Sequence, residues 1–320
     1  MKVLLVFSVD HDWSTHRVLD WCYSFNIKPI IIDSSELDLF ITSVTIDQDQ
    51  NSFKIDYKNE SISSDDLIGY WYRRSSPLEI EKWKFKDLTP EFFEFVVQEL
   101  RYFNSGFFHL LKKIKGINNL NSAVMDKTKA LLLAKEHGIK IPSTHYVTNS
   151  KRFAEILASG KTYITKPIYN MTKISTEDVN YLQYTELVDP NEVPNVEAIF
   201  PTLLQEQINK QLELRVFYLD EKIYPMAIFS QEAQQTSLDF RRYLSDRPNR
   251  TVPYYIDDNL KSKIIKLMND LELNSGSLDF ILSDEDELVF LEVNPVGQFG
   301  MVSGPCNYYL EKKIVEYFMN

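Results

Sequence analysis

The chain has 320 residues, of which 44% are apolar, and a formal net charge of −11. This length exceeds one minimal domain, and the composition is typical of a globular protein with a sizeable core. The acidic balance argues against a non-specific nucleic-acid binder, which needs a basic face. Two cysteines, Cys22 and Cys306, give no disulfide framework and no metal spacing, so we expect two buried free thiols in a reducing cytoplasm.

No targeting or membrane segment is expected. The opening "MKVLLVFSVDHD" is apolar for a short run only and has no small-residue cleavage pattern, so it predicts a first strand and not a signal peptide. No apolar run approaches the roughly 20 residues needed to span a bilayer. The sequence therefore predicts a cytoplasmic protein without membrane contact.

The first third predicts an α/β lobe. Near-continuous apolar runs at 2–8 and 28–33 are typical of strands buried on both faces of a sheet, and a helical pattern at 16–25 lies between them. Such a β-α-β start indicates a parallel sheet. Residues 67–74, "LIGYWYRR", predict a further strand that ends in two arginines, and 90–114 predict a long helix.

A second unit is expected to begin near Gly116. Its first helix lies within 125–144, where Asp126 can cap the start and Gly138 supplies a left-handed stop. Strands are then expected at 145–148, 161–167, 201–208, 212–220 and 222–231, with a turn at Asp220–Glu221, helices at 152–159 and 257–272, and a polar loop at 168–178.

The stretch "SLDFILSDEDELVFLEVNP" (277–295) predicts a hairpin. A four-residue loop at 284–287 would pair Ser283 with Leu288, a common hairpin length. Continuing this register places Asp279 directly opposite Glu292.

Asn294 shares a face with Glu292, because side chains alternate along a strand. Two carboxylates as close as Asp279 and Glu292 are costly to bury without a cation. Oxygen donors with no nearby Cys or His suit Mg²⁺. The sequence thus predicts a magnesium site, and the alternative is the polar outer face of an edge hairpin.

Two lysines and an apolar strand are further candidates. Lys127 begins a helix and Lys166 ends a strand, where a fixed ammonium can act as a point charge for phosphate. The alternative is that each lysine is a solvated surface residue. The strand "LLQEQI" carries Gln205, Glu206 and Gln207, which could offer hydrogen bonds to a planar base.

The arginines leave two interpretations open. Arg73 and Arg74 end a strand and either serve a function or pair with surface acids; the preceding Trp71 and Tyr72 are expected in the core. Arg241 lies in a polar segment and is either functional or solvated. The five histidines show no ligand spacing.

In order along the chain, these pieces resemble the ATP-grasp carboxylate–amine ligases. The resemblance runs from "DKTKALLLAKEHGIKIPST" through "YITKP", "LLQEQI" and "ELRVFYLDEKIYPMAIFSQ" to "LDF" and "LEVNP", about the last two-thirds of the chain. Within that superfamily the motifs "GYWYRRSS", "SLDFRRY" and "LEVNPVGQFG" are most similar to those of the graspetide (microviridin-type and grasp-with-spasm) maturases of ribosomal peptides.

The resemblance implies roles for individual residues. It implies no particular lid residue, because "KPIYNMTKISTED" has no glycine where many relatives carry a glycine-rich flap. The implied roles are ATP phosphate contacts by Lys127 and Lys166, an adenine hinge at Glu206, Gln207 and Ile208, a ribose or triphosphate contact by Glu213, magnesium binding by Asp279, Glu292 and Asn294, a transferring-phosphate contact by Arg215, and a contact of Arg241 with an acidic side chain of the peptide.

The resemblance also implies the fold class and the partners. The fold would be α/β, an ATP-grasp fold with an N-terminal α/β lobe at 1–115 and two α+β lobes at 116–204 and 205–320 that enclose the nucleotide. ATP and Mg²⁺ would be the cofactors and a ribosomal precursor peptide, with leader and acidic core, the partner. A homodimer is plausible from the likeness.

We expect an enzyme that uses ATP to join Asp or Glu side chains of the peptide to Ser, Thr or Lys side chains, giving ester or amide cross-links. One alternative is a glutamate-ligase-like enzyme that adds amino acids to a protein or small acceptor. An alternative of another class is a nucleotide-binding module without turnover.

Overall fold

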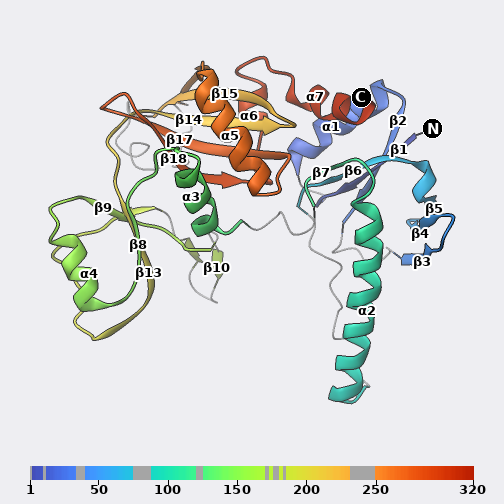
Figure 1. Cartoon of the computed structure of the whole chain (residues 1–320), viewed down its shortest axis with the longest axis horizontal. Helices are drawn as coiled ribbons and strands as arrows, with labels where there is room; N and C mark the ends of the chain where they lie inside the picture. The colour runs from blue at the N-terminus through green and yellow to red at the C-terminus, as the bar shows by residue number, and fades with distance from the viewer. Residues whose placement is uncertain are drawn as a thin grey trace. The chain divides into compact units, whose positions relative to one another are not determined.

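The chain divides into two units, each with its own sheets (Figure 1). Unit 1 comprises residues 1–124, 272–275 and 295–320, and unit 2 comprises 125–271 and 276–294. The computed structural model describes residues 2–9, 12–33, 40–74, 88–119, 125–169, 173–175, 180–182, 185–230 and 249–320.

A four-stranded parallel sheet organises unit 1 and confirms the predicted β-α-β start. The apolar run at the N-terminus forms its second strand, which is buried from its second residue onward because both faces are covered. Trp71 and Tyr72 are buried at the end of the third strand, as predicted. The order is β2 (Ile27–Ile32), β1 (Lys2–Phe7), β6 (Leu67–Tyr72) and β7 (Gly116–Ile117), with α1 (Trp13–Ser24) between β1 and β2.

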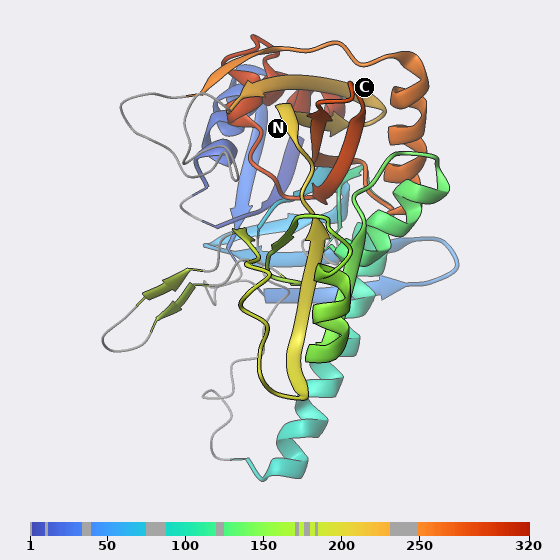
Figure 2. The ribbon, with the colours of Figure 1, turned by 90° about the vertical axis from the view of Figure 1, so that its left-hand side faces the viewer.

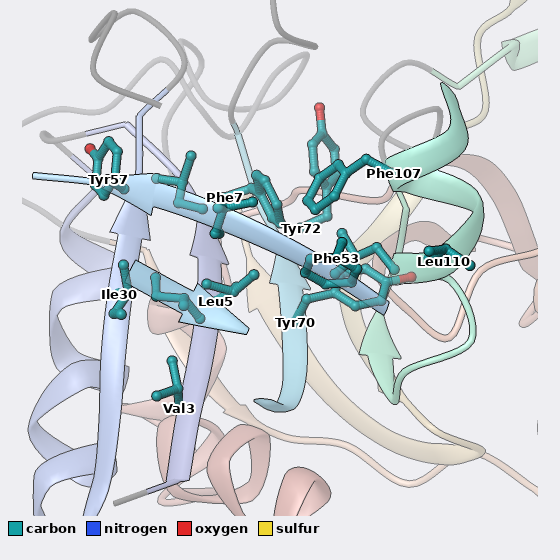
Figure 3. Close-up of a cluster of buried hydrophobic side chains, with 14 residues drawn as sticks. Val3, Leu5, Phe7, Ile30, Phe53, Tyr57, Tyr70, Tyr72, Phe107 and Leu110 are labelled. Atoms are coloured by element: carbon teal, nitrogen blue, oxygen red, sulfur yellow. The ribbon is translucent and has the colours of Figure 1, made fainter. Parts of the chain in front are cut away.

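An antiparallel sheet and a long helix complete the core of unit 1. The strands are β3 (Phe40–Ile46), β4 (Asn51–Tyr57) and β5 (Glu60–Ser63), followed by the 3₁₀ turn η1 (Ser64–Asp66) and later by α2 (Pro90–Leu111). Phe53 of β4 and Phe107 of α2 meet edge-on, with ring centroids 4.8 Å apart. Figure 3 shows these rings beside Tyr70 and Tyr72 of β6, so one apolar cluster joins both sheets to the helix.

The C-terminal helices belong to unit 1. After α6 (Gly300–Ser303), helix α7 (Leu310–Met319) packs against α1. A side chain at Gly69 of β6 would overlap the ring of Phe318 of α7, so glycine permits this close approach.

The division into three lobes at 1–115, 116–204 and 205–320 stays a prediction. None of the helices in the described ranges is long and apolar enough to span a membrane.

Unit 2 contains an antiparallel sheet covered by one helix (Figure 2). Phe153 and Ile156 of α4 pack on Leu204 in a small apolar core. The loop predicted at 168–178 is wrong in part, because β10 (Lys173–Ser175) lies within it and pairs with β11 (Asn180–Leu182) just beyond it. The sheet order is β12 (Glu186–Leu187), β9 (Tyr163–Thr165), β13 (Ala198–Glu206) and β8 (Thr144–Asn149), with α4 (Ser150–Leu157) after β8.

The second sheet of unit 2 has five strands. The predicted turn at Asp220–Glu221 is confirmed, with φ of 48° and 63°. Helix α5 (Asp258–Asp270) lies over the sheet (Figure 1), and a side chain at Gly276 would lie 3.3 Å from Met268 Cε. The order is β16 (Arg250–Pro253), β15 (Lys222–Phe229), β14 (Lys210–Leu219), β17 (Ser275–Ser283) and β18 (Leu288–Asn294).

The hairpin formed by β17 and β18 confirms one predicted pair and corrects another. Asp279 pairs with Glu292, as predicted, but Leu288 pairs with Leu282 and not with Ser283. The connection is therefore one residue longer than expected. A β-bulge between the two ends restores the register, because one extra residue of β18 lies opposite Asp279 and Phe280.

Both cysteines are free and buried, as expected. Burial raises the pKa of Cys22 to about 12, and burial also raises the pKa of Cys306. At pH 8 about one Cys22 thiol in ten thousand is therefore ionised in the folded chain.

At pH 8 the thiols of the native protein should react slowly with a chromogenic aromatic disulfide, because both are buried. The urea-unfolded chain should react at both cysteines and release two equivalents of the coloured thiolate per chain. Rapid labelling of the native protein would contradict the burial of these thiols.

The ring pair in the core of unit 1 gives a stability prediction. Phe107→Ala should lower the free energy of unfolding by about 3–5 kcal/mol, because it removes a fully buried ring and leaves a cavity against Phe53. Phe103→Ala is the matched control on the same helix, since 41% of Phe103 is exposed, and should cost about 1 kcal/mol or less. Urea unfolding followed by far-UV circular dichroism measures both; equal losses would show that the ring of Phe107 is not part of the core.

Candidate functional site

Two predicted lysines meet one predicted metal ligand in unit 2. Helix α3 (Lys127–Glu136) packs against β18, and its first residue brings an ammonium group 4.0 Å from Glu292 Oε2. Lys166 follows β9 directly and brings its Nζ 3.6 Å from the same oxygen. Lys127 also donates a hydrogen bond of 3.1 Å to the carbonyl of Pro167. A helix and two strands far apart in sequence thus place two cations on one carboxylate.

The side chains of this charge cluster are largely shielded from water. Lys127 and Lys166 are 19% and 13% exposed, and Glu292 is 26% exposed. The interpretation of both lysines as solvated surface residues is therefore wrong. Partial burial strengthens the attraction between unlike charges, because water screens them less than at an open surface.

The second predicted carboxylate has its own cation. Arg215 of β14 donates from Nη1 to both oxygens of Asp279, at 2.6 Å each, between neighbouring strands of the five-stranded sheet. Only 9% of the Arg215 side chain and 17% of the Asp279 side chain are exposed. An arginine so deeply buried needs a carboxylate partner, so this pair fixes both groups.

One face of the sheet therefore gathers oxygen donors. Asp279 lies opposite Glu292 across the hairpin, and Asn294 follows on the same strand face, with its side chain exposed. Between them, Val293 points to the opposite side and is buried. The arrangement predicted for these three side chains is thus present in the fold.

These donors fit a hard divalent cation. The described residues contain no group of three or more His, Cys, Asp or Glu side chains that could hold a metal, so a cation here draws on two carboxylates and one amide. Such a set would leave coordination positions open, as Mg²⁺ that also binds substrate phosphates requires. Arg215 and the two lysines supply the positive charge that faces these carboxylates in the structure.

Glu213 lies two residues before Arg215 on β14, and two groups that the sequence did not single out hold it. Lys210 Nζ lies 2.5 Å and Ser230 Oγ 2.7 Å from Glu213 Oε1, and only 6% of the Lys210 side chain is exposed. Burial raises the pKa of Glu213, although the lysine and serine contacts oppose this shift. The sequence offered one signal for this pair: Lys210 stands at the start of a strand, three residues before Glu213.

The predicted adenine hinge lies at the end of β13. The Glu206 N–H donates to Ser143 O at 2.8 Å, and the Gln207 N–H donates to Thr162 O at 2.9 Å. Within the described part of the chain, the half-buried Ile208 has no hydrogen-bond partner for its N–H. The Glu206 carboxylate pairs with Lys161, and this hydrogen bond raises the pKa of Lys161.

Three predicted arginines have different outcomes. Arg241, with Asp239 beside it in sequence, lies outside the described residues. Pairing with surface acids is wrong for Arg73, because its partner is the buried Asp12, with Nε and Oδ2 2.9 Å apart. Arg74 lies 3.5 Å from the same carboxylate oxygen.

Comparison with known proteins identifies the fold. No family model and no curated protein matches the sequence. A RiPP-associated ATP-grasp ligase from Chryseobacterium gregarium, solved with ADP and a leader and core peptide, is 21% identical with a TM-score of 0.81, over 99% of this chain and 95% of that one. Macrocyclase MdnC from Microcystis aeruginosa, bound with precursor peptide MdnA, is 22% identical with a TM-score of 0.77, over 100% of both chains.

A third similar structure is the ATP-grasp ligase PsnB, solved with a minimal precursor, Mg and ADP. It is 14% identical, with a TM-score of 0.72, over 99% of this chain and 96% of that one. The α/β fold of this chain is therefore the ATP-grasp fold, as the resemblance predicted. More particularly, it is similar along nearly its whole length to ligases that were solved with peptides bound.

The Arg215–Asp279 pair gives a testable stability effect. Asp279→Leu should lower the free energy of unfolding by about 3 kcal/mol, because it leaves a buried guanidinium without its carboxylate. The double variant Arg215→Met, Asp279→Leu should recover most of that loss, since no charge stays buried. Urea unfolding measures both; equal stability of the single and double variants would show that the pair is not energetically coupled.

Proposed function

We propose that this chain is an ATP-dependent, ADP-forming ligase that cross-links a ribosomal precursor peptide. In this proposal it phosphorylates Asp or Glu side chains of the peptide core and joins them to Ser, Thr or Lys side chains as esters or amides. The observation that supports it most is the convergence of Lys127 and Lys166 on Glu292 beside the Arg215–Asp279 pair. The full-length likeness to peptide-bound ligases supports the same reading.

The reaction must bring two anions together. A peptide carboxylate attacks the γ-phosphorus of ATP, the bond from phosphorus to the bridging oxygen breaks, and an acyl phosphate and ADP form. A hydroxyl or amine of the same peptide then attacks the acyl carbon and releases inorganic phosphate, so one water is lost per link overall. Fixed positive charge lowers the barrier of the first step, because negative charge is concentrated at the phosphoryl group.

The side chains of this chain supply that charge. Lys127 and Lys166 would hold the triphosphate, moving from the Glu292 carboxylate to phosphate oxygens when the nucleotide binds. Arg215 would contact the transferring phosphoryl group while Asp279 fixes its guanidinium. Arg241 would orient the peptide carboxylate.

Asp279, Glu292 and Asn294 would hold Mg²⁺. When bound, the ion neutralises phosphate charge that the lysines leave uncompensated. The cross-strand pair of carboxylates and the amide on the same face are the support for this assignment.

The nucleotide base would lie along the segment that follows β13. With the Glu206 and Gln207 amides engaged by neighbouring strands, the Ile208 N–H is the donor left for adenine. Glu213, held by Lys210 and Ser230, would accept hydrogen bonds from the ribose hydroxyls or contact the triphosphate.

The direct test is incubation with ATP, Mg²⁺ and a peptide from a neighbouring gene that carries repeated Thr and Asp or Glu residues. Mass spectrometry should show the loss of one water per cross-link, with one ADP formed for each. A mass gain equal to an added amino acid, in a reaction supplied with free glutamate, would favour the glutamate-ligase alternative. ATP binding without ADP formation or any change of peptide mass would favour the nucleotide-binding module.

Lys166→Met should lower kcat/KM for ATP by about 100-fold, because a partly buried phosphate contact is lost. Glu292→Gln should abolish nucleotide-dependent product. Lys140→Met is the matched control, since Lys140 pairs with Glu287 near the turn of the same hairpin and is half exposed. Retention of the full rate in the Lys166 and Glu292 variants would refute the site assignment.

A further inference from the structure

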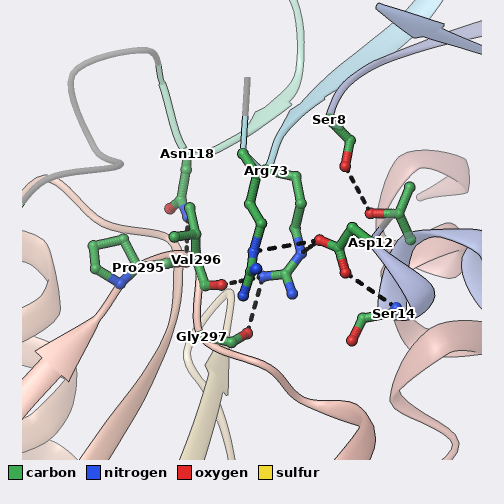
Figure 4. Close-up of polar contacts among 10 residues, drawn as sticks. Ser8, Asp12, Ser14, Arg73, Asn118, Pro295, Val296 and Gly297 are labelled. Carbon is green, nitrogen blue, oxygen red and sulfur yellow. Dashed lines mark hydrogen bonds and ion pairs between the residues drawn. The ribbon is translucent and has the colours of Figure 1, made fainter. Parts of the chain in front are cut away.

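The backbone that leaves the proposed metal site is held by side chains at successive carbonyls. Asn294 is the last residue of β18, and a turn and irregular backbone at 295–299 follow it before α6 begins. Arg73 Nη1 donates to Val296 O at 2.6 Å and to Gly297 O at 2.9 Å, and Asn118 Nδ2 donates to Pro295 O at 3.1 Å (Figure 4). The sheet ladder ends at Asn294, and these bonds replace it.

Arg73 is itself immobilised on every side. Its side chain is 3% exposed and its Nε lies 2.9 Å from Asp12 Oδ2. The guanidinium lies 5.9 Å from the ring centroid of Trp71 and 5.2 Å from that of Phe299. Asp12 in turn caps α1, because its Oδ1 accepts from the Ser14 N–H at 3.1 Å. Arg73 thus follows β6 directly, pairs with the residue that caps α1 and lies near two aromatic rings, and these contacts fix its guanidinium.

Asn118 is fixed in a comparable way. Its N–H donates to Asn274 Oδ1 at 2.7 Å, and its own Oδ1 accepts from the Ser275 N–H at 3.2 Å. It has φ of 57°, a left-handed conformation that asparagine tolerates. Side chains from two separate parts of unit 1 therefore hold the same segment.

Holding a loop with a buried charge pair has an unfavourable desolvation free energy. Removing both Asp12 and Arg73 from water costs free energy that their attraction offsets only when the geometry is good. Hydrophobic residues of similar volume would fill the space more cheaply, but they could not direct hydrogen bonds at particular carbonyls. A guanidinium presents several donors in a rigid fork, which suits two neighbouring carbonyls together with a carboxylate.

We infer that Arg73, supported by Asp12 and acting together with Asn118, is a positioning residue for the proposed Mg²⁺ site. It fixes the backbone immediately after Asn294, and the pairing of Asn294 with Ser277 fixes the backbone on the hairpin side. The amide ligand is then held from both directions along the chain. This inference rests on the proposed function, because it takes Asn294 as a ligand of the ion.

The test uses full-length protein and calorimetric binding of ADP at increasing Mg²⁺ concentrations. In Arg73→Met combined with Asp12→Asn, no buried charge is left unpaired and the asparagine still caps α1. The Mg²⁺ concentration at half-maximal strengthening of ADP binding should rise by about 10-fold, as for groups that orient metal ligands. ADP binding in EDTA should be unchanged.

A second variant approaches the same segment from the other side. Asn118→Gly keeps the left-handed backbone and leaves the Arg73–Asp12 pair intact, but it removes the donor to Pro295 O and the acceptor of the Ser275 N–H. It should shift the Mg²⁺ midpoint in the same direction. Arg73→Lys keeps the charge opposite Asp12 and loses the fork, so its shift should be intermediate.

Arg74→Met is the matched control. Arg74 touches the same Asp12 carboxylate, at 3.5 Å, but among the described residues it reaches none of the three carbonyls. Its Mg²⁺ midpoint should equal that of the wild type. Amide hydrogen exchange over 296–300 should be faster in the Arg73 and Asn118 variants than in this control, which reports on the segment without turnover.

The outcomes separate the two claims. If wild-type ADP binding does not depend on Mg²⁺, the proposed function fails at its metal site. If the wild type depends on Mg²⁺ and the folded Arg73 and Asn118 variants keep the wild-type midpoint, the positioning role is refuted while the function stands. Should the Arg73 double variant not fold, Asn118→Gly decides alone, with its melting temperature as the check on folding.

Discussion

The repulsion between two carboxylates on directly opposite residues of one hairpin is the constraint around which the candidate site in unit 2 is arranged. Asp279 and Glu292 lie opposite each other in a hairpin, and each forms ion pairs with cationic side chains of other segments. Arg215 compensates one and the two lysines compensate the other. Without these cations the hairpin would carry two partly buried, unpaired negative charges, which would destabilise the folded state.

This arrangement suits a site that exchanges partners. Lysines that rest on a carboxylate at 3.6 Å and 4.0 Å are held in place but not tightly bound. In the proposed reaction the phosphates of ATP take over the lysines, while Asp279 keeps its contact with Arg215 and the carboxylates bind a divalent ion. The lysines need only exchange a carboxylate oxygen for phosphate oxygens, so little free energy is spent on reshaping the site.

The charged side chains of the candidate site belong to unit 2. The segment that follows Asn294 belongs to unit 1 and is bonded within that unit by Arg73 and Asn118. The first arginine of the motif "GYWYRRSS" thus binds backbone carbonyls and a buried carboxylate. The ring centroids of Trp71 and Phe299 lie 5.9 Å and 5.2 Å from its guanidinium.

The sequence by itself determined many of the local elements, though not the antiparallel strands β3, β4 and β5, and one pair within the site. Apolar periodicity located the parallel strands of unit 1 and the helices, and strand alternation placed Asp279 opposite Glu292, because a short hairpin leaves few registers. It missed the bulge, since one inserted residue changes the pairing at the turn without changing the pattern of apolar positions. Lys127 and Lys166 were candidates from their positions at a helix start and a strand end, but a solvated role stayed open until the structure showed their burial.

Tertiary structure alone decided which charges meet. Lys127, Lys166 and Glu292 lie on three elements whose packing depends on the whole apolar core of unit 2, and no local pattern encodes that contact. Asp12 and Arg73 likewise pair because parallel strands β1 and β6 bring their carboxyl ends together. Pairing between side chains on distant segments depends on chain topology, so it could be known only from the tertiary structure. The alternation of side chains along a strand depends on neighbouring residues, so it could be predicted from the sequence.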